Sequence, residues 1–240
     1  NELVLIHGLG TNATIWDQVV PYLAGSFRVE RYELHGHGTT PPLEEPTIAN
    51  EVAALAAWLR EKALPLPTLV GHGLGGMVAM QFALEHPADV HRLIVIDAGP
   101  KQMASDEEKA TIGQGLVDDY DRFVASSFLT VSEDPEVVDT VVDMALRTDS
   151  TTLAPLLLSS FDWDVSAAIP NFSVPMLVIA SENYLPEPGY ERDWLAAYGY
   201  DGARTLHYKK LPETGHYVML EAPARLASHI AVYARQDAFR

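Results

Sequence analysis

A glycine-rich turn at residues 71–76, reading Gly-His-Gly-Leu-Gly-Gly, is the feature of this chain that points most directly to chemistry. A short apolar run, residues 68–70, enters the turn, and a helical pattern leaves it at Leu74. The pattern G-x-S-x-G uses such a sharp strand-to-helix turn to lift a nucleophilic serine above a sheet. Here the residue at the tip is Gly73, which has no side chain. The sequence therefore predicts a nucleophile elbow that lacks its nucleophile.

Length and charge limit the classes of function. At 240 residues the chain fits one domain with an insertion, and its 48% hydrophobic content is enough for a sizeable core. Its 16 basic and 33 acidic residues give a net charge of −17. Such a charge repels phosphate backbones and anionic lipids, so we expect neither nucleic acid nor a membrane as partner. Without cysteines the chain has neither a thiolate nucleophile nor a cysteine metal site.

The start of the chain is abrupt. Residues 3–6 already form a strand-like apolar run, and there is no initiator Met. We therefore expect that an N-terminal segment is missing from this sequence. No signal peptide and no apolar run of about 18 residues are visible, and we expect a cytoplasmic protein.

Strand-like runs alternate with helical patterns along the chain. Such alternation predicts βαβ units, hence a parallel sheet with helices on both faces and ligands bound beyond the carboxyl ends of the strands. Residues 100–170 break the alternation with helical segments and no clear strand, which indicates a helical insertion over one end of the sheet. Strands are expected at 3–6, 27–34, 68–70, 93–97, 176–180 and 204–211, and helices at 15–23, 48–62, 74–86, 190–198 and 223–233.

The chain resembles the α/β-hydrolases. The resemblance rests on His-Gly-Leu-Gly at 7–10, Gly-His-Gly at 36–38, the turn at 71–76, and Gly-His at 215–216 before the last helix. It covers nearly the whole chain from the third strand of that fold onward. It implies an α/β-hydrolase fold with a core of residues 1–99 and 171–240 and a helical cap insertion at 100–170.

The resemblance assigns a general base and an acid. His216, in the loop after the last expected strand, can reach the tip of the elbow and accept a proton; the alternative is a loop histidine with local hydrogen bonds only. The usual acid position reads Tyr184 where Asp is expected. Some branches of the fold place the acid after the preceding strand, where this chain has Asp97. Asp97 could orient the imidazole or merely cap the next turn, and Glu182 is the reserve candidate.

Other site residues follow from position in the fold. The backbone amides of Leu9 and Leu74 are expected to form the oxyanion hole. Trp163 and Tyr184 are candidates for the substrate pocket, although Trp163 fits an ordinary core tryptophan equally well. The histidines at 7, 35, 37 and 72 lack the spacing of a metal site, so neither a metal nor any other cofactor is expected.

Gly73 leaves three functions open. The first is a carboxylic ester or lactone hydrolase silenced at the nucleophile position. The second is a cofactor-free dioxygenase or lyase that needs only a His–Asp base, acting on a compound like a 3-hydroxy-4-quinolone; residues 187–191 resemble that branch weakly. The third is a noncatalytic receptor. In each case the expected partner is an apolar small molecule: an ester, a lactone or a ring compound.

Overall fold

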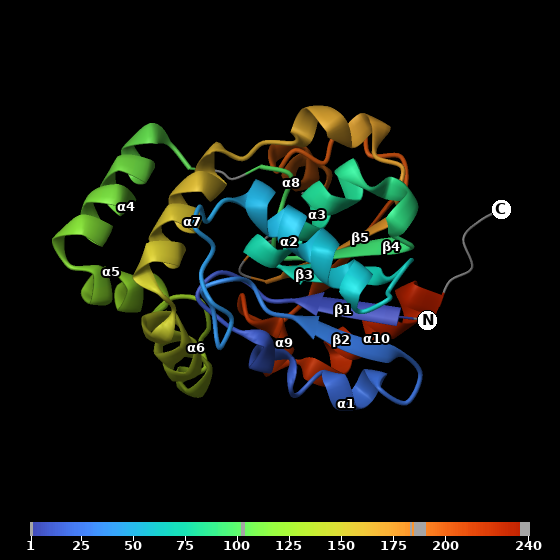
Figure 1. Ribbon diagram of the computed structural model, residues 1–240, viewed down its shortest axis with the longest axis horizontal. Helices are drawn as coiled ribbons and strands as arrows, with labels where there is room; N and C mark the ends of the chain where they lie inside the picture. Colours follow the sequence, from blue (N-terminus) through green and yellow to red (C-terminus); the bar gives the residue numbers. More distant parts are fainter. Residues whose placement is uncertain (1, 102–103, 183, 185–190, 236–240) are drawn as a thin grey trace.

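A single parallel sheet organises the chain, with strands in the order β2-β1-β3-β4-β5-β6 (Figure 1). The computed structural model describes residues 2–101, 104–182, 184 and 191–235. From β1 the chain first adds β2 on one side and then crosses to add β3 to β6 on the other side. The order of the strands therefore reverses between β1 and β3, and the carboxyl ends of these two strands lie side by side. Ligands of open α/β sheets bind at such a switch point. The strands are β1 (Glu2–Ile6), β2 (Arg28–Tyr32), β3 (Thr68–His72), β4 (Arg92–Ile96), β5 (Met176–Ser181) and β6 (Leu206–Leu211).

Helices cover both faces of the sheet. One face packs against α2 (Ile48–Glu61) and α3 (Leu74–Glu85), with α8 (Glu191–Ala197) beside them. The other face packs against α1 (Val20–Leu23) and α10 (Pro223–Arg235). Each face has its own hydrophobic core because the buried side chains of a strand alternate between the two faces. Apart from the α-helices between β4 and β5, the remaining described elements are the short helix α9 (Val218–Glu221) and the 3₁₀ turns η1 (Ala13–Trp16), η2 (Pro87–Asp89) and η3 (Ser166–Asn171).

The insertion between β4 and β5 is helical. Its helices gather beyond the carboxyl ends of the strands, at the left of Figure 1. Their starts carry ordinary caps, such as the Ser105–Glu108 capping box before α4. A small apolar core holds them together, and Leu9, from the loop after β1, packs against it. The helices are α4 (Asp106–Asp118), α5 (Tyr120–Ser127), α6 (Pro135–Arg147) and α7 (Ser150–Asp162).

Two expected elements differ most from their expected bounds. The helix expected at 15–23 is divided into the 3₁₀ turn η1 and the short helix α1, which begins beside Pro21; proline lacks the amide hydrogen that would continue a helix. The strand expected at 27–34 ends at Tyr32, because the amide of Leu34 donates a hydrogen bond to His7 Nε2 (3.0 Å). Among the described residues no helix has both the length and the apolarity needed to cross a membrane.

Candidate active site

The turn after β3 has the backbone of a nucleophile elbow. Gly73 adopts φ +51° and ψ −121°, a region that side chains rarely occupy. Its amide donates to the carbonyl of Ile96 on β4 (3.0 Å), and its carbonyl accepts from the amides of Gly76 (2.9 Å) and Met77 (3.2 Å). The neighbouring strand and the first turn of α3 therefore fix the tip of the elbow from both sides.

Close backbone contact explains a second glycine of the turn. A Cβ atom on Gly75 would lie 2.7 Å from the carbonyl oxygen of Ile6 and would collide with that of His7. Gly75 thus lets α3 begin directly against the end of β1. The same approach brings Leu9, in the loop after β1, to the edge of the elbow.

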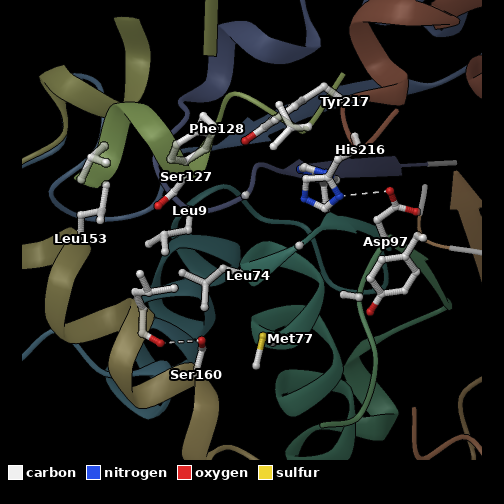
Figure 2. A pocket seen from close by; sticks show the side chains of 18 of the residues that line it. Leu9, Leu74, Met77, Asp97, Ser127, Phe128, Leu153, Ser160, His216 and Tyr217 are labelled. Atoms are coloured by element: carbon white, nitrogen blue, oxygen red, sulfur yellow. Dashed lines mark hydrogen bonds and ion pairs between the residues drawn. The ribbon is translucent and has the colours of Figure 1, made fainter. Parts of the chain in front are cut away.

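His216 and Asp97 form a hydrogen-bonded pair beside the elbow. His216 Nδ1 lies 3.0 Å from Asp97 Oδ2, as the dashed line in Figure 2 shows. A carboxylate can only accept, so Nδ1 carries the hydrogen and Nε2 presents a lone pair. His216 Nε2 lies 3.8 Å from the point where a Cβ on Gly73 would sit. The structure therefore brings together the expected base, acid and nucleophile position.

Ser181, at the end of β5, holds the Asp97 carboxylate from the other side. Its amide donates to Oδ1 (2.7 Å) and its hydroxyl donates to Oδ2 (2.5 Å). The Asp97 side chain is completely buried, whereas 31% of the His216 side chain is exposed. Asp97 also has φ +46°, in the left-handed region that Asp tolerates better than most residues. Sequence reasoning missed Ser181, although it lies where β5 ends beside β4.

Glu182 lies outside this pair. Its carboxylate accepts from the amide of Glu213 (2.7 Å) and from Lys210 Nζ (3.1 Å). These two bonds, the Glu213 amide first, lower the pKa of Glu182 below its ordinary value. The reserve acid is therefore engaged with β6 and the loop after it rather than with His216.

Buried histidines tie the surrounding loops together. His72, next to the tip, donates from Nε2 to the carbonyl of His216 (3.0 Å) and so attaches the final loop to the elbow. His7 donates to the carbonyl of Gly8 (2.8 Å), and His37 accepts from the amide of Gly10 (3.2 Å). Burial lowers the pKa of all three, to about 3 for His7, so they stay neutral. Within the described ranges no three His, Asp or Glu side chains are placed to share a metal ion.

Two backbone amides beside the elbow are available to a ligand. Across the described residues, the amides of Leu9 and Leu74 have no hydrogen-bond acceptor. Leu74 is the first residue of α3, where helical amides have no partner within the helix. Amides in these two loops can stabilise the oxyanion of a tetrahedral intermediate. The structure places both residues at the cavity described next.

A cavity of about 320 Å³ lies between the elbow and the insertion. Figure 2 shows the His216–Asp97 pair at one end and Leu9, Leu74, Phe128 and Leu153 around the rest. Most of its wall is apolar, and helices of the insertion supply much of it. The lining from the insertion consists of Phe123, Val124, Ser127, Phe128, Val131, Leu153, Leu157 and Ser160.

The two residues expected in the substrate pocket lie in different places. Tyr184 lines the cavity, and burial raises its pKa well above the ordinary value, so it stays protonated. Of the described residues that line the cavity, none is Trp163. Its indole Nε1 donates to Gln81 Oε1 on α3 (3.1 Å), and its ring packs against the core on that face. Trp163 is thus partly buried against the core of this face.

Comparison with known proteins decides the family. A model described as the alpha/beta hydrolase family matches residues 3–229. The chain belongs to this family. Pimeloyl-[acyl-carrier protein] methyl ester esterases are among its curated relatives. The one from Aeromonas hydrophila is 43% identical over 44% of this chain and 41% of its own length. That from Vibrio atlanticus is 30% identical over 73% of each. The chain thus spans less than half the length of the first curated relatives that it matches.

Solved structures show the same fold at low identity. A thermophilic esterase from Thermogutta terrifontis matches with a TM-score of 0.85 at 21% identity, over 98% of this chain and 89% of its own. The enol-lactonase from Burkholderia xenovorans LB400 matches with a TM-score of 0.85 at 20% identity, over 98% and 92%. This alpha/beta hydrolase therefore combines the fold of such enzymes with a glycine at the tip of its elbow.

Proposed function

We propose that this alpha/beta hydrolase carries the site of a carboxylic ester or lactone hydrolase whose nucleophile position is silenced by Gly73. One observation carries the proposal. The lone pair of His216 Nε2 faces the open position at Gly73, while Asp97 holds the other ring nitrogen. A base that is oriented in this way can activate a hydroxyl group placed at the tip of the elbow.

With a serine at position 73, the site would support acyl transfer through a covalent intermediate. The hydroxyl would attack the carbonyl carbon while His216 accepted its proton and Asp97 stabilised the imidazolium. The amides of Leu9 and Leu74 would hold the oxyanion. With Gly73 that intermediate cannot form, so water is the attacking group. The remaining machinery still gives about 10³–10⁴-fold over the reaction in water, as in triad deletions of other enzymes.

The cavity indicates the class of substrate. Its volume of about 320 Å³ is near the lower end for small-molecule pockets, and its wall is mostly apolar. At about 30 Å³ per heavy atom, it holds an acyl group or ring of roughly ten heavy atoms. We propose the insertion at 100–170 as the cap that sets this size, because it supplies Phe128 and Leu153 opposite the elbow. The relatives named as pimeloyl-[acyl-carrier protein] methyl ester esterases, and the enol-lactonase, support an ester or a lactone as the reacting group.

Restoring the nucleophile tests the proposal. Gly73→Ser should raise the hydrolysis of a p-nitrophenyl ester or a lactone by orders of magnitude, because the nearest described atoms outside the two chain neighbours lie 3.8 Å from a Cβ at this position. Adding His216→Ala should abolish the gain. His86→Ala, at the exposed end of α3, is the matched control and should leave it intact. No gain in a folded Gly73→Ser protein would contradict the proposal.

A second candidate function uses the same pair differently. Cofactor-free dioxygenases and lyases of this fold need a His–Asp base more than a nucleophile, and this chain keeps the pair without the serine. On that account the unmodified protein should consume oxygen with a 3-hydroxy-4-quinolone, and His216→Ala should stop it. Residues 187–190 of the segment that resembles this branch lie outside the described residues. A ligand that binds with neither activity would favour the receptor function instead.

A further inference from the structure

Ser160 interrupts the apolar stripe that α7 turns toward the cavity. Leu153, Leu157 and Ser160 all line the cavity. Their spacing of four and then three residues places them on one face of the helix. Ser160 is only 3% exposed, so its hydroxyl lies in a largely apolar wall with little access to water. A buried hydroxyl is costly unless its hydrogen-bonding groups have partners, and the partners of Ser160 therefore indicate what the cavity accepts.

The hydroxyl of Ser160 uses its hydrogen inside α7. Ser160 Oγ lies 2.7 Å from the carbonyl oxygen of Leu157, as the dashed line beside Ser160 in Figure 2 shows. A carbonyl oxygen can only accept, so the hydroxyl donates to it and keeps its own lone pairs. Ser127 is the other polar side chain that the described part of the insertion adds to the lining, and its hydroxyl donates to the carbonyl of Phe123 (2.9 Å). The described residues of the insertion thus offer the cavity side-chain acceptors but no side-chain donor.

The elbow offers the opposite kind of group. There the backbone amides of Leu9 and Leu74 are donors that await an acceptor. Figure 2 shows Ser160 on the far side of the labelled residues from Asp97 and His216. A ligand that satisfies both ends therefore carries an acceptor at the elbow, which is the reacting carbonyl, and a hydrogen-bond donor at some distance from it.

We propose that Ser160 selects an ester or lactone whose acyl part carries a hydroxyl or N–H group remote from the reacting carbonyl. This group donates to Ser160 Oγ. The inference rests on the proposed function and narrows its class of substrate. Ser160 acts on binding and orientation alone, because it lies away from the reacting atoms. Ser127 contributes less, since it is exposed and water can replace the substrate as its partner.

Paired methyl esters in the Gly73→Ser background test the inference. The esters of 6-hydroxyhexanoic, 7-hydroxyheptanoic and 8-hydroxyoctanoic acid are each compared with the ester of the unsubstituted acid, by pH-stat. The measured quantity is the ratio of kcat/KM for the hydroxy ester to that for its alkyl partner. For at least one pair, Ser160→Ala should lower this ratio about 10-fold, because the buried hydroxyl of the substrate loses its acceptor.

Ser159→Ala is the matched control. The Ser159 hydroxyl makes the same kind of bond, to the carbonyl of Leu156 (3.0 Å), but Ser159 is not among the described residues that line the cavity. Its replacement should leave the ratio unchanged for every pair. Thermal unfolding checks that each variant is folded. A serine that only stabilises α7 would change the rates for both esters of a pair equally.

The possible failures are distinguishable. If Gly73→Ser hydrolyses the esters but Ser160→Ala leaves the ratio unchanged for all three pairs, the role of Ser160 is refuted and the proposed function stands. If Gly73→Ser hydrolyses none of them, the proposed function fails. The affinities of the unmodified protein for the same pairs, measured by ligand-observed NMR titration, then decide the inference. Tighter binding of a hydroxy ester that Ser160→Ala removes would support it, and equal binding of both esters in every pair would overturn it.

Discussion

Exchanging Asp97 for asparagine in a Gly73→Ser background tests which carboxylate orients the base. Asp97 is buried and accepts three hydrogen bonds, from the amide and hydroxyl of Ser181 and from His216 Nδ1. Asparagine has a single acceptor oxygen, so its NH₂ group would face at least one of these donors. Where that donor is His216, the proton moves to Nε2 and the lone pair that serves as base is lost.

The expected loss is large. The corresponding change in a Ser-His-Asp protease, which retains its geometry, lowers kcat by about 10⁴. That factor corresponds to about 5.4 kcal/mol of transition-state stabilisation at about 1.36 kcal/mol per tenfold. The assay is kcat/KM for p-nitrophenyl butyrate, measured from acid to neutral pH. The same substitution should also lower the thermal unfolding temperature, because it leaves a buried donor without an acceptor.

Glu182→Gln in the same background is the matched control. Glu182 interacts with Lys210 and with the amide of Glu213, and 43% of its side chain is exposed. Exposed pairs of this kind contribute little, so kcat/KM should change by less than about twofold. A loss at Glu182 comparable to that at Asp97, or full activity of the Asp97→Asn protein, would refute the assignment of the acid.

Three further predictions concern the support of the site. Ser181→Ala removes the hydroxyl that holds Asp97. In the Gly73→Ser background, kcat should therefore fall with little change in KM, and the pH profile of kcat should shift. An unchanged pH profile would contradict a positioning role for Ser181. Gly75→Ala should destabilise the fold by about 3 kcal/mol because its Cβ meets the end of β1, whereas Gly25→Ala, with nothing within 4 Å, should be neutral in urea unfolding. The buried neutral histidines His7, His37 and His72 have pKa values below those of the unfolded chain, which therefore binds more protons as pH falls below about 6.5. Below that pH the free energy of unfolding should fall by up to about 1.4 kcal/mol per pH unit for each of these histidines. Equal urea unfolding midpoints at pH 7 and pH 5 would contradict their burial as neutral rings.

The elbow and the order of the elements were predictable because local rules control them. A glycine at the tip, glycines at the close contacts, and Pro87 after α3 all act within a few residues. The buried runs 3–6 and 93–97 marked strands of a parallel sheet, and the structure confirms both strands, at Glu2–Ile6 and Arg92–Ile96. The α/β-hydrolase fold is confirmed in the same way, by the sheet and by the family match.

The partners of the site were harder to predict because they come from distant segments. Ser181 and Asp97 are 84 residues apart in sequence and meet only because β5 pairs with β4. The sequence indicated helical segments in the insertion, but it could not show that Phe128 and Leu153 line the cavity at the elbow. Trp163 illustrates the same limit, since its sequence neighbourhood did not distinguish the cavity from the core.

The burst of p-nitrophenol from the Gly73→Ser protein tests the central claim most directly. If His216, Asp97 and the amides of Leu9 and Leu74 face position 73 as acyl-transfer machinery, the first turnover should release one p-nitrophenol per active site. Mass spectrometry should then find the butyryl group on residue 73. A folded Gly73→Ser protein that gives no burst and no acylated residue 73 would contradict the account.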